Sequence, residues 1–474
     1  SPIRRATLHA VGDRDDNIST SAKAALRQRL VGFDPLTGTS AGGHKVYLTI
    51  DAELNAAALD ALNGRKGAVA VYNYRTGDVL CMVSSPTFDP ADPPEIRDGD
   101  SRYDGVYLNR VLSSTFAPGS IFKLVTTAAA LEQLDGTLDR HFTCTGRLEL
   151  EGGTITCPYA HGEMDLYDAL ARSCNCAYAQ LAVELGGDTL AQYAEKAGLT
   201  QGFSVSGISA AAGQFTVGQG ADLGWSGVGQ YDDLVNPCAF LRLLGSLAGG
   251  KTVGPRLVYQ ETTMHGIPLP GDGAPSLKAP FDADTCRVLR DMMRNNVQQT
   301  YGQGMFGSLA VCAKSGTAEA APGQSPHAWF AGFVADEDLP LAFVVLVENG
   351  GGGADAVIVV VIVAAAEGVD VHFRVAALRF KAAFGDFFAF LFKDFFFAFA
   401  FFRCRTGFLG AVVFVVLVVK VKIPAFLFLV LEVAFVFRLF RPAFFFFRCL
   451  TRLFRLFFFQ ALFFLAAFLF FQLF

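Results

Sequence analysis

The stretch FAPGSIFKL, residues 116–124, places a serine and a lysine three positions apart behind a Pro-Gly pair. The segment that follows is apolar almost all round, which predicts a buried helix beginning near Ser120. Residues three apart share a helix face, so Ser120 and Lys123 would be neighbours at the positive end of the helix dipole. Burial lowers the pKa of a lysine, and a neutral Lys123 could take the proton of the Ser120 hydroxyl. The pair therefore predicts a serine nucleophile with a lysine base.

The same pair also has a purely structural interpretation. Ser120 could cap the helix, and Lys123 could extend its amine to solvent. Two further polar groups favour catalysis. S-x-N at residues 173–175 lies where two helices are expected to meet, and K-S-G at residues 314–316 lies on an expected strand. Three such groups in this order rarely occur together by chance, so the set predicts an active site.

The elements that would hold these groups indicate an α+β fold. Residues 67–85 alternate around Thr76-Gly77 and predict a β-hairpin. Residues 308–349 predict three strands in a meander, and residues 119–245 are mainly helical. The simplest assembly is one antiparallel sheet built from the hairpin and the last three strands. Helices would flank this sheet, and a helical lobe would be inserted between its two parts.

Bulk composition excludes some classes of protein. The chain has 474 residues, a length that allows two or three domains, and a formal net charge of -5. The first 350 residues carry no basic field, so we expect no nucleic-acid partner. Ten cysteines in a chain of this length are too few for a disulfide-built scaffold.

Composition changes abruptly near residue 355. Of the 47 phenylalanines, 34 lie beyond residue 350, and no Ser, Asn, Tyr, Trp or Met follows Asp355. Apolar runs such as residues 408–419 end after about a dozen residues, short of the roughly 20 that a membrane helix needs. We therefore expect residues 356–474 to be an out-of-frame translation rather than a membrane region.

A cysteine cluster leaves two kinds of chemistry open. Cys144, Cys157 and His161 have the spacing C-x12-C-x3-H, and Cys174 and Cys176 follow. Such soft ligands could hold a structural zinc ion. The favoured alternative is a disulfide between Cys144 and Cys157 across an expected hairpin, which would be natural in a domain outside the membrane, or free thiols.

The three polar groups form the set shared by penicillin-binding proteins and class A β-lactamases. Further matching stretches are ATLHAVGD, GAVAVYNYRTGDVLCMVSSPTFDP, STFAPGSIFKLVTTAAALE, ARSCNCAYAQLA, VCAKSGTAEA and HAWFAGFVA. Over roughly residues 6–350 the chain resembles a class B penicillin-binding protein, a peptidoglycan D,D-transpeptidase. The resemblance implies a penicillin-binding-protein/β-lactamase-like transpeptidase domain at residues 51–355. It also implies part of an N-terminal pedestal domain at residues 1–50, and it does not extend to residues 356–474.

The resemblance assigns the chemistry to the first two motifs. Ser120 would attack the penultimate D-Ala carbonyl of a stem peptide, with Lys123 as its base. Ser173 and Asn175 would relay protons and hold the substrate amide. The residue between them, Cys174, departs mildly from the family pattern.

Substrate binding falls to the third motif. Lys314 would place its charge near the terminal carboxylate of the substrate, and the hydroxyls of Ser315 and Thr317 would bind that group. Gly316 would leave the strand edge open for the substrate backbone. The backbone N–H groups of Ser120 and Thr317 would form the oxyanion hole.

The implied partners are stem peptides that end in D-Ala-D-Ala, β-lactams that acylate Ser120, and membrane proteins of cell-wall synthesis. No cofactor is implied. The expected location is the extracytoplasmic face of the cell membrane, with the anchor outside this chain. A serine β-lactamase is the alternative enzyme, for which no motif assigns the extra base, although Glu319 follows the K-S-G group. A β-lactam sensor or stem-peptide binding module without turnover is the non-enzymatic alternative.

Overall fold

The computed structural model describes residues 1–353 except positions 35, 41, 98, 272, 321 and 322, together with position 356 and two short strands further on. The chain divides into two units, Ser1–Ala382 and Ala383–Phe474. In the second unit the described residues form an antiparallel pair, β18 (Ala398–Phe399) and β19 (Val415–Val416). The expected out-of-frame segment therefore lies almost entirely outside the described residues. None of the described helices is long and apolar enough to cross a bilayer.

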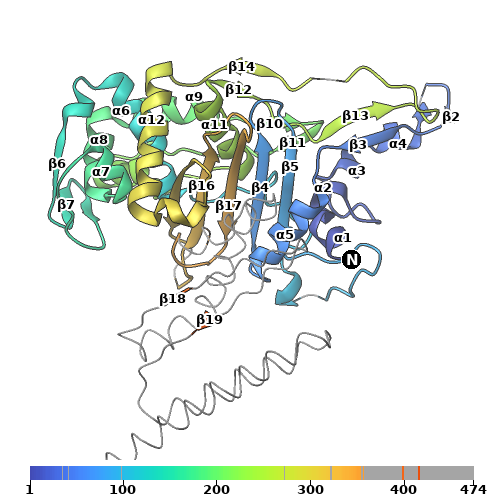
Figure 1. Cartoon of the computed structure of the whole chain (residues 1–474), viewed down its shortest axis with the longest axis horizontal. Coiled ribbons are helices and arrows are strands. Elements are labelled where there is room, and N and C mark those ends of the chain that lie inside the picture. The colour runs from blue at the N-terminus through green and yellow to red at the C-terminus, as the bar shows by residue number, and fades with distance from the viewer. Residues whose placement is uncertain are drawn as a thin grey trace, which may run out of the picture. The chain divides into compact units, whose positions relative to one another are not determined.

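A five-stranded antiparallel sheet forms the centre of the first unit (Figure 1). Its strands are β4 (Gly67–Asn73), β5 (Val79–Ser85), β15 (Val311–Ala318), β16 (His327–Val334) and β17 (Leu341–Val347). Their order is β15-β16-β17-β4-β5, so the predicted hairpin and the predicted meander join into one sheet. The join is between β17 and β4, where Val344 pairs with Ala70. β15 is left at an edge of the sheet.

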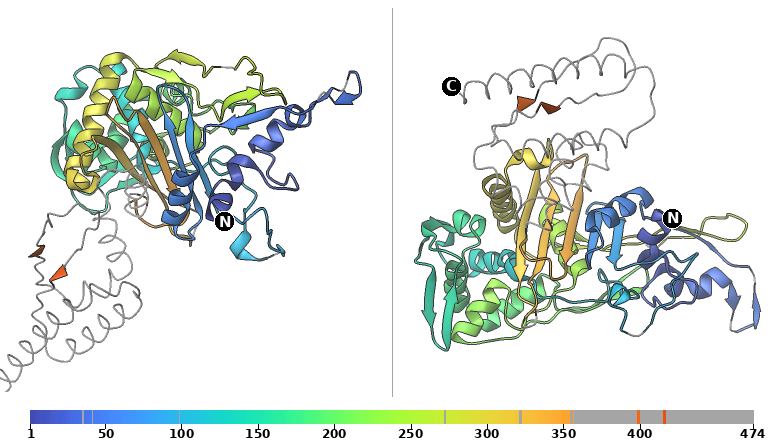
Figure 2. Two further views of the ribbon diagram at one scale, coloured as in Figure 1. Left: turned by 45° about the vertical axis from the view of Figure 1, so that its right-hand side comes forward. Right: turned by 90° about the horizontal axis from the view of Figure 1, so that it is seen from below.

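Both faces of the sheet are covered, and side chains alternate between them with the period of two that strands impose. Ala68, Ala70 and Tyr72 contribute to the larger hydrophobic core, whereas Val69 and Val71 contribute to a second core. The helices α11 (Pro237–Gly249) and α12 (Ala283–Asn296) pack on the first face, and α5 (Ala52–Leu62) packs on the second (Figure 2). This layering confirms the expected α+β fold of a sheet flanked by helices.

The lobe inserted between β5 and β15 is built on helices, as expected. These are α6 (Lys123–Gln133), α7 (Leu166–Ala171), α8 (Asn175–Leu185), α9 (Gly187–Lys196) and α10 (Gly220–Val228). Three short antiparallel pairs join them: β6 (His141–Cys144) with β9 (Gly162–Asp165), β7 (Arg147–Leu150) with β8 (Gly153–Thr156), and β10 (Phe203–Val205) with β11 (Ile208–Ala210). Residues Lys123 to Ala130 of α6 are all buried, which makes α6 the central helix of the lobe.

The N-terminal residues form a separate group of short elements. They are α1 (Pro2–Ala6), α2 (Leu8–Val11), α3 (Ala22–Ala25), α4 (Arg27–Val31), β1 (Phe33–Asp34), β2 (Thr39–Ser40) and β3 (Lys45–Leu48). β3 pairs with β13 (Val258–Thr262), and β12 (Lys251–Val253) pairs with β14 (Ser276–Lys278). Leu8 and Ile18 pack against Phe88 and Val106 in a small core of their own. The assignment of residues 1–50 to a pedestal domain stays a prediction.

Candidate active site

Ser120 lies in a short 3-10 turn, η2 (Gly119–Ile121), directly before α6. The turn packs against β15 at backbone distance. Gly119 has φ 56°, and a Cβ at this position would lie 2.4 Å from the Thr317 carbonyl oxygen. A larger residue would push the turn off the strand, so Gly119 is needed both for its left-handed backbone and for this close approach. The half-buried Ser120 is thereby held next to the end of β15.

Lys123 is fully buried, and its amine is completely hydrogen bonded. Nζ donates to the Ser173 carbonyl at 2.7 Å, to Ser173 Oγ at 3.1 Å and to Asn175 Oδ1 at 2.8 Å. Burial, followed by the charge of Lys314, lowers the pKa of Lys123 well below its usual value. Among the described contacts its partners are thus in the S-x-N motif rather than at Ser120. Catalytic hydrogen bonds are often loose before substrate binds.

The S-x-N motif lies at the junction of α7 and α8, as the sequence predicts. Ser173 has φ 53°, in the left-handed region, and the strained turn brings its carbonyl and hydroxyl together toward Lys123. Cys174 caps α8, where its Sγ accepts from the Ala177 N–H at 3.5 Å. The Asn175 side chain donates to the Thr156 carbonyl at 2.8 Å, which fixes its oxygen toward the lysine.

The K-S-G motif lies on the edge strand β15. Lys314 is 1% exposed, and burial lowers its pKa to about 7. Its Nζ donates to the Ser315 carbonyl at 3.0 Å, and the Ser315 hydroxyl accepts from the Tyr301 hydroxyl at 2.5 Å. A Cβ at Gly316 would lie 2.9 Å from the Pro118 carbonyl oxygen, so the absence of a side chain there admits the turn that carries Ser120. Thr317 follows as an exposed residue.

The structure therefore brings the three predicted motifs together around one buried amine. Ser120 comes from a turn before a helix, the S-x-N residues come from a helix junction that begins 53 positions later, and the K-S-G residues come from an edge strand. The lysines are close enough for Lys314 to disfavour charge on Lys123. A neutral amine, a serine at a helix start and backbone N–H groups at a strand edge can together carry out acyl transfer.

Three further residues support the motifs and were not identified from the sequence. The centre of the Tyr178 ring lies 5.4 Å from Lys123 Nζ, and the Tyr301 hydroxyl donates a hydrogen bond to the Ser315 hydroxyl. Gln230 hydrogen bonds to the end of β15. Single tyrosines and glutamines carry no spacing signal, so only the fold could show these contacts.

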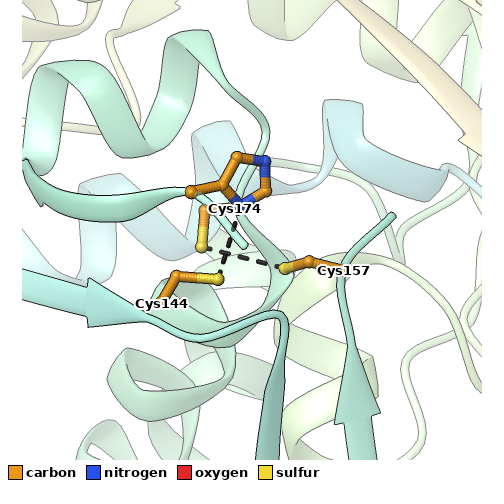
Figure 3. A group of neighbouring side chains, drawn as sticks. Cys144, Cys157 and Cys174 are labelled. Atoms are coloured by element: carbon orange, nitrogen blue, oxygen red, sulfur yellow. Dashed lines mark hydrogen bonds between the residues drawn. The ribbon is translucent and has the colours of Figure 1, made fainter. Parts of the chain in front are cut away.

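The side chains of the predicted cysteine cluster lie close together in the structure (Figure 3). The potential ligand atoms of Cys144, Cys157, His161 and Cys174 lie within 4.8 Å of one another. Cys144 and Cys157 are free thiols in the structure, so the considered disulfide does not form. Hydrogen bonding from Cys174 is the main cause that lowers the pKa of the Cys157 thiol to about 4. Cys176 lies beside the group, with its sulfur 3.5 Å from that of Cys157.

Comparison with known proteins decides the family. Residues 67–363 match the family described as penicillin binding protein transpeptidase domain. The chain belongs to the penicillin-binding protein transpeptidase family. It is a peptidoglycan D,D-transpeptidase of the serine type.

Two relatives and one solved structure support the assignment of this chain to the transpeptidase family. The chain is 30% identical over 365 residues to the peptidoglycan D,D-transpeptidase PbpA of Mycobacterium tuberculosis, covering 71% of this chain and 73% of the relative. It is 25% identical over 381 residues to the peptidoglycan D,D-transpeptidase MrdA of Acinetobacter baumannii, covering 71% and 55%. A penicillin G acyl-enzyme structure of penicillin-binding protein A from M. tuberculosis superposes with a TM-score of 0.66 at 26% identity, covering 77% and 92%.

Proposed function

We propose that Ser120 is the acylated nucleophile of this transpeptidase and that Lys123 is its base. The observation that supports this most directly is the buried Lys123 amine, whose pKa is lowered and whose hydrogen bonds all go to the S-x-N motif. After losing one proton the amine can keep two of its three hydrogen bonds, and its lone pair then takes the Ser120 proton as Oγ attacks the penultimate D-Ala carbonyl. The N–H groups of Ser120 and Thr317 bind the developing oxyanion.

The acyl-enzyme then forms and is resolved in balanced steps. The terminal D-Ala leaves as a free amine after receiving the proton, which passes from Lys123 through the Ser173 hydroxyl. Asn175 holds the substrate amide during the transfer. The amine of a second stem peptide attacks the Ser120 ester, loses its proton to Lys123 and forms the cross-link, while the Ser120 hydroxyl is restored.

The substrate is a stem peptide that ends in D-Ala-D-Ala. Lys314 supplies positive charge for its terminal carboxylate, and the Ser315 and Thr317 hydroxyls bind the same group. Gly316 and the open edge of β15 accept the extended substrate backbone. β-Lactams present a carboxylate and a reactive amide in the same arrangement, so they acylate Ser120 and remain bound. We further propose that the enzyme acts at the extracytoplasmic face of the cell membrane, among membrane proteins of cell-wall synthesis; its similarity to peptidoglycan D,D-transpeptidases supports this location.

A structural metal ion is the second part of the proposal. Cys144, Cys157, His161 and Cys174 offer three thiols and one imidazole, a ligand set that suits zinc in a closed tetrahedral site. The lowered pKa of Cys157 supplies one of the thiolates that metal binding needs. The hydrogen bond to Cys157 raises the pKa of Cys174, so the thiolate of Cys174 would depend on the bound cation itself. The bound ion would tie the β6–β9 pair to the start of α8, because Cys174 caps that helix.

Reaction with a labelled penicillin and with a donor peptide tests the function and its alternatives. We expect a stable adduct that Ser120→Ala abolishes, together with exchange of the donor's terminal D-Ala for an added D-amino acid. Rapid release of hydrolysed penicillin would instead identify a β-lactamase. A stable adduct without exchange would identify a sensor or binding module.

A further inference from the structure

Gln230 connects the loop after α10 to the end of β15. Its side-chain N–H donates to the Thr317 carbonyl at 3.1 Å, and its side-chain oxygen accepts from the Glu319 N–H at 3.1 Å. The amide therefore uses both its donor and its acceptor on one short stretch of strand. Among the described residues, it bridges the carbonyl of Thr317, the fourth position of K-S-G-T, to the backbone N–H two residues later.

Both contacts lie where β15 ends, next to the proposed oxyanion hole: Thr317 is in the strand and Glu319 is one residue beyond it. In a strand, the N–H and C=O of one residue point to the same side, and residues two apart repeat that direction. The Thr317 N–H, the Thr317 carbonyl and the Glu319 N–H therefore all face away from β16 or all face toward it. The Thr317 carbonyl and the Glu319 N–H both bond to Gln230, so they face the open edge of β15, away from β16. The Thr317 N–H therefore faces the open edge as well.

The backbone next to Gln230 also holds the turn that carries Ser120. Gly229 ends α10 with φ 92°, and its carbonyl accepts from the Gly119 N–H at 2.7 Å. A Cβ at Gly229 would lie 2.1 Å from the Gly119 carbonyl oxygen, just as one at Gly119 would lie 2.4 Å from the Thr317 carbonyl oxygen. The backbones at Gly229, Gly119 and Thr317 thus lie against one another without side chains between them. The Gln230 side chain connects the first of these segments to the third.

We propose that Gln230 is a positioning residue that sets the oxyanion hole, because it ties β15 to the same loop that holds the Ser120 turn. This inference rests on the proposed roles of the Ser120 and Thr317 N–H groups. The two N–H groups come from different elements, and a hole works only when both point to one position. Gln230 and Gly229 fix the strand and the turn to one another through three hydrogen bonds.

The test is pre-steady-state acylation of the full chain by a fluorescent penicillin, which separates non-covalent binding from the acylation rate constant. Gln230→Met keeps the length of the side chain and removes both hydrogen bonds. We expect the acylation rate constant to fall about 10- to 100-fold, because a displaced oxyanion donor should cost less than a deleted one, which costs about 100- to 1,000-fold. The non-covalent dissociation constant should stay within about twofold.

Gln230→Glu provides a readout that a general loss of stability would not give. An ionised carboxylate can accept from the Glu319 N–H but repels the Thr317 carbonyl, whereas a protonated carboxyl donates and accepts as the amide does. We expect the acylation rate of this variant, relative to wild type at each pH, to recover as the pH falls. The matched control is Gln303→Met, since Gln303 also donates to two backbone carbonyls, those of Gly307 and Leu309, before β15 begins. This control should change thermal stability more than acylation.

The outcomes separate the competing roles of Gln230. If Gln230 instead occupies the strand edge until substrate displaces it, Gln230→Met would bind or acylate faster than wild type, and that result overturns the proposal. Unchanged acylation with a lower melting temperature, or no recovery of Gln230→Glu at low pH, overturns it as well. Failure of the wild-type chain to be acylated at Ser120 would instead contradict the proposed function.

Discussion

Lys123 and Lys314 are two buried amines with opposite tasks in the proposed mechanism. Burial disfavours charge on both, and the proximity of the pair disfavours it further on Lys123. Lys123 must be neutral to act as a base, whereas Lys314 must be charged to bind a carboxylate. The lysine that must lose its proton is thus the one under the additional influence of a neighbouring charge.

The pH dependence of acylation by penicillin follows from the pKa of Lys314. Its pKa of about 7 means that free enzyme loses this charge as the pH rises through 7. The second-order acylation constant should therefore decline above about pH 7, by up to about tenfold per pH unit. The rate at saturating penicillin should decline less, because the bound carboxylate favours the protonated amine. On the acid side both should fall as Lys123 becomes protonated.

Penicillin methyl ester is the matched control for this pH profile. It lacks the carboxylate, so its slower acylation should show no decline that depends on Lys314. A flat second-order constant for penicillin between pH 7 and pH 9 would remove Lys314 from carboxylate binding.

Sequence spacing predicted the residues that we propose to react, but not their hydrogen bonds. The three-residue separation correctly places Ser120 and Lys123 at the start of one helix. The direction of the lysine side chain depends on acceptors at Ser173 and Asn175, about 50 residues away. Local spacing cannot encode such acceptors, because the tertiary fold alone brings them to the amine.

The junction of α7 and α8 is the element on which the site depends most. It carries Ser173 and Asn175 on one side and Cys174 on the other, so one short turn serves both the proposed active site and the cysteine cluster. The sequence predicted the junction from helix patterning. It did not predict that Cys174 would join Cys144, Cys157 and His161, since the strands that bring these together are only four residues long and polar in part.

Metal removal tests the role of this junction. We expect purified protein to contain one zinc ion per chain, and dialysis against a strong chelator should lower the melting temperature and slow acylation, both restored by added zinc. Cys144→Ser should reproduce both effects, because it removes a ligand on β6 and leaves the sequence of α8 unchanged. Cys286→Ser is the control, as it changes a buried free thiol of α12. Protein without metal that still acylates at full rate would contradict the structural metal.

Within the first unit, an ion pair connects the loop before the active-site turn to the residue that follows β17. Arg110 and Glu348 are 238 positions apart, and their side chains form a hydrogen-bonded pair that is 3% and 19% exposed. Arg110 also donates to the Gly105 carbonyl at 2.8 Å, and the Glu348 N–H donates to the Lys66 carbonyl at 2.9 Å. The pair therefore joins the two parts of the chain that build the sheet.

Loss of this ion pair should destabilise the whole domain. Glu348→Gln leaves the Arg110 guanidinium buried without its counter-charge, which costs about 3 kcal/mol in similar cases. Urea denaturation should show a clear fall in the midpoint. Glu95→Gln is the control, because its pair with Arg97 is about three-quarters exposed and should contribute less than about 1 kcal/mol. Equal midpoints for the two variants would contradict a stabilising role.

The overall assembly was largely predictable, because the strands at residues 67–85 and 308–349 are apolar on both faces, and one sheet covered by helices on each side buries both faces. Less predictable were the N-terminal elements, such as β3, whose pairing with β13 spans more than 200 residues. These strands are short and partly exposed, so no hydrophobic pattern specifies their partners.

Peptide mapping by mass spectrometry can show whether Ser120 carries the acyl group. After incubation with penicillin G and proteolysis, the peptide that contains residues 116–124 should carry the mass of one intact penicillin, localised to Ser120. Ser120→Ala should carry none while retaining the melting temperature of the wild type. An adduct on any other residue, or an equal adduct on the Ser120→Ala variant, would show that Ser120 is not the acylated nucleophile.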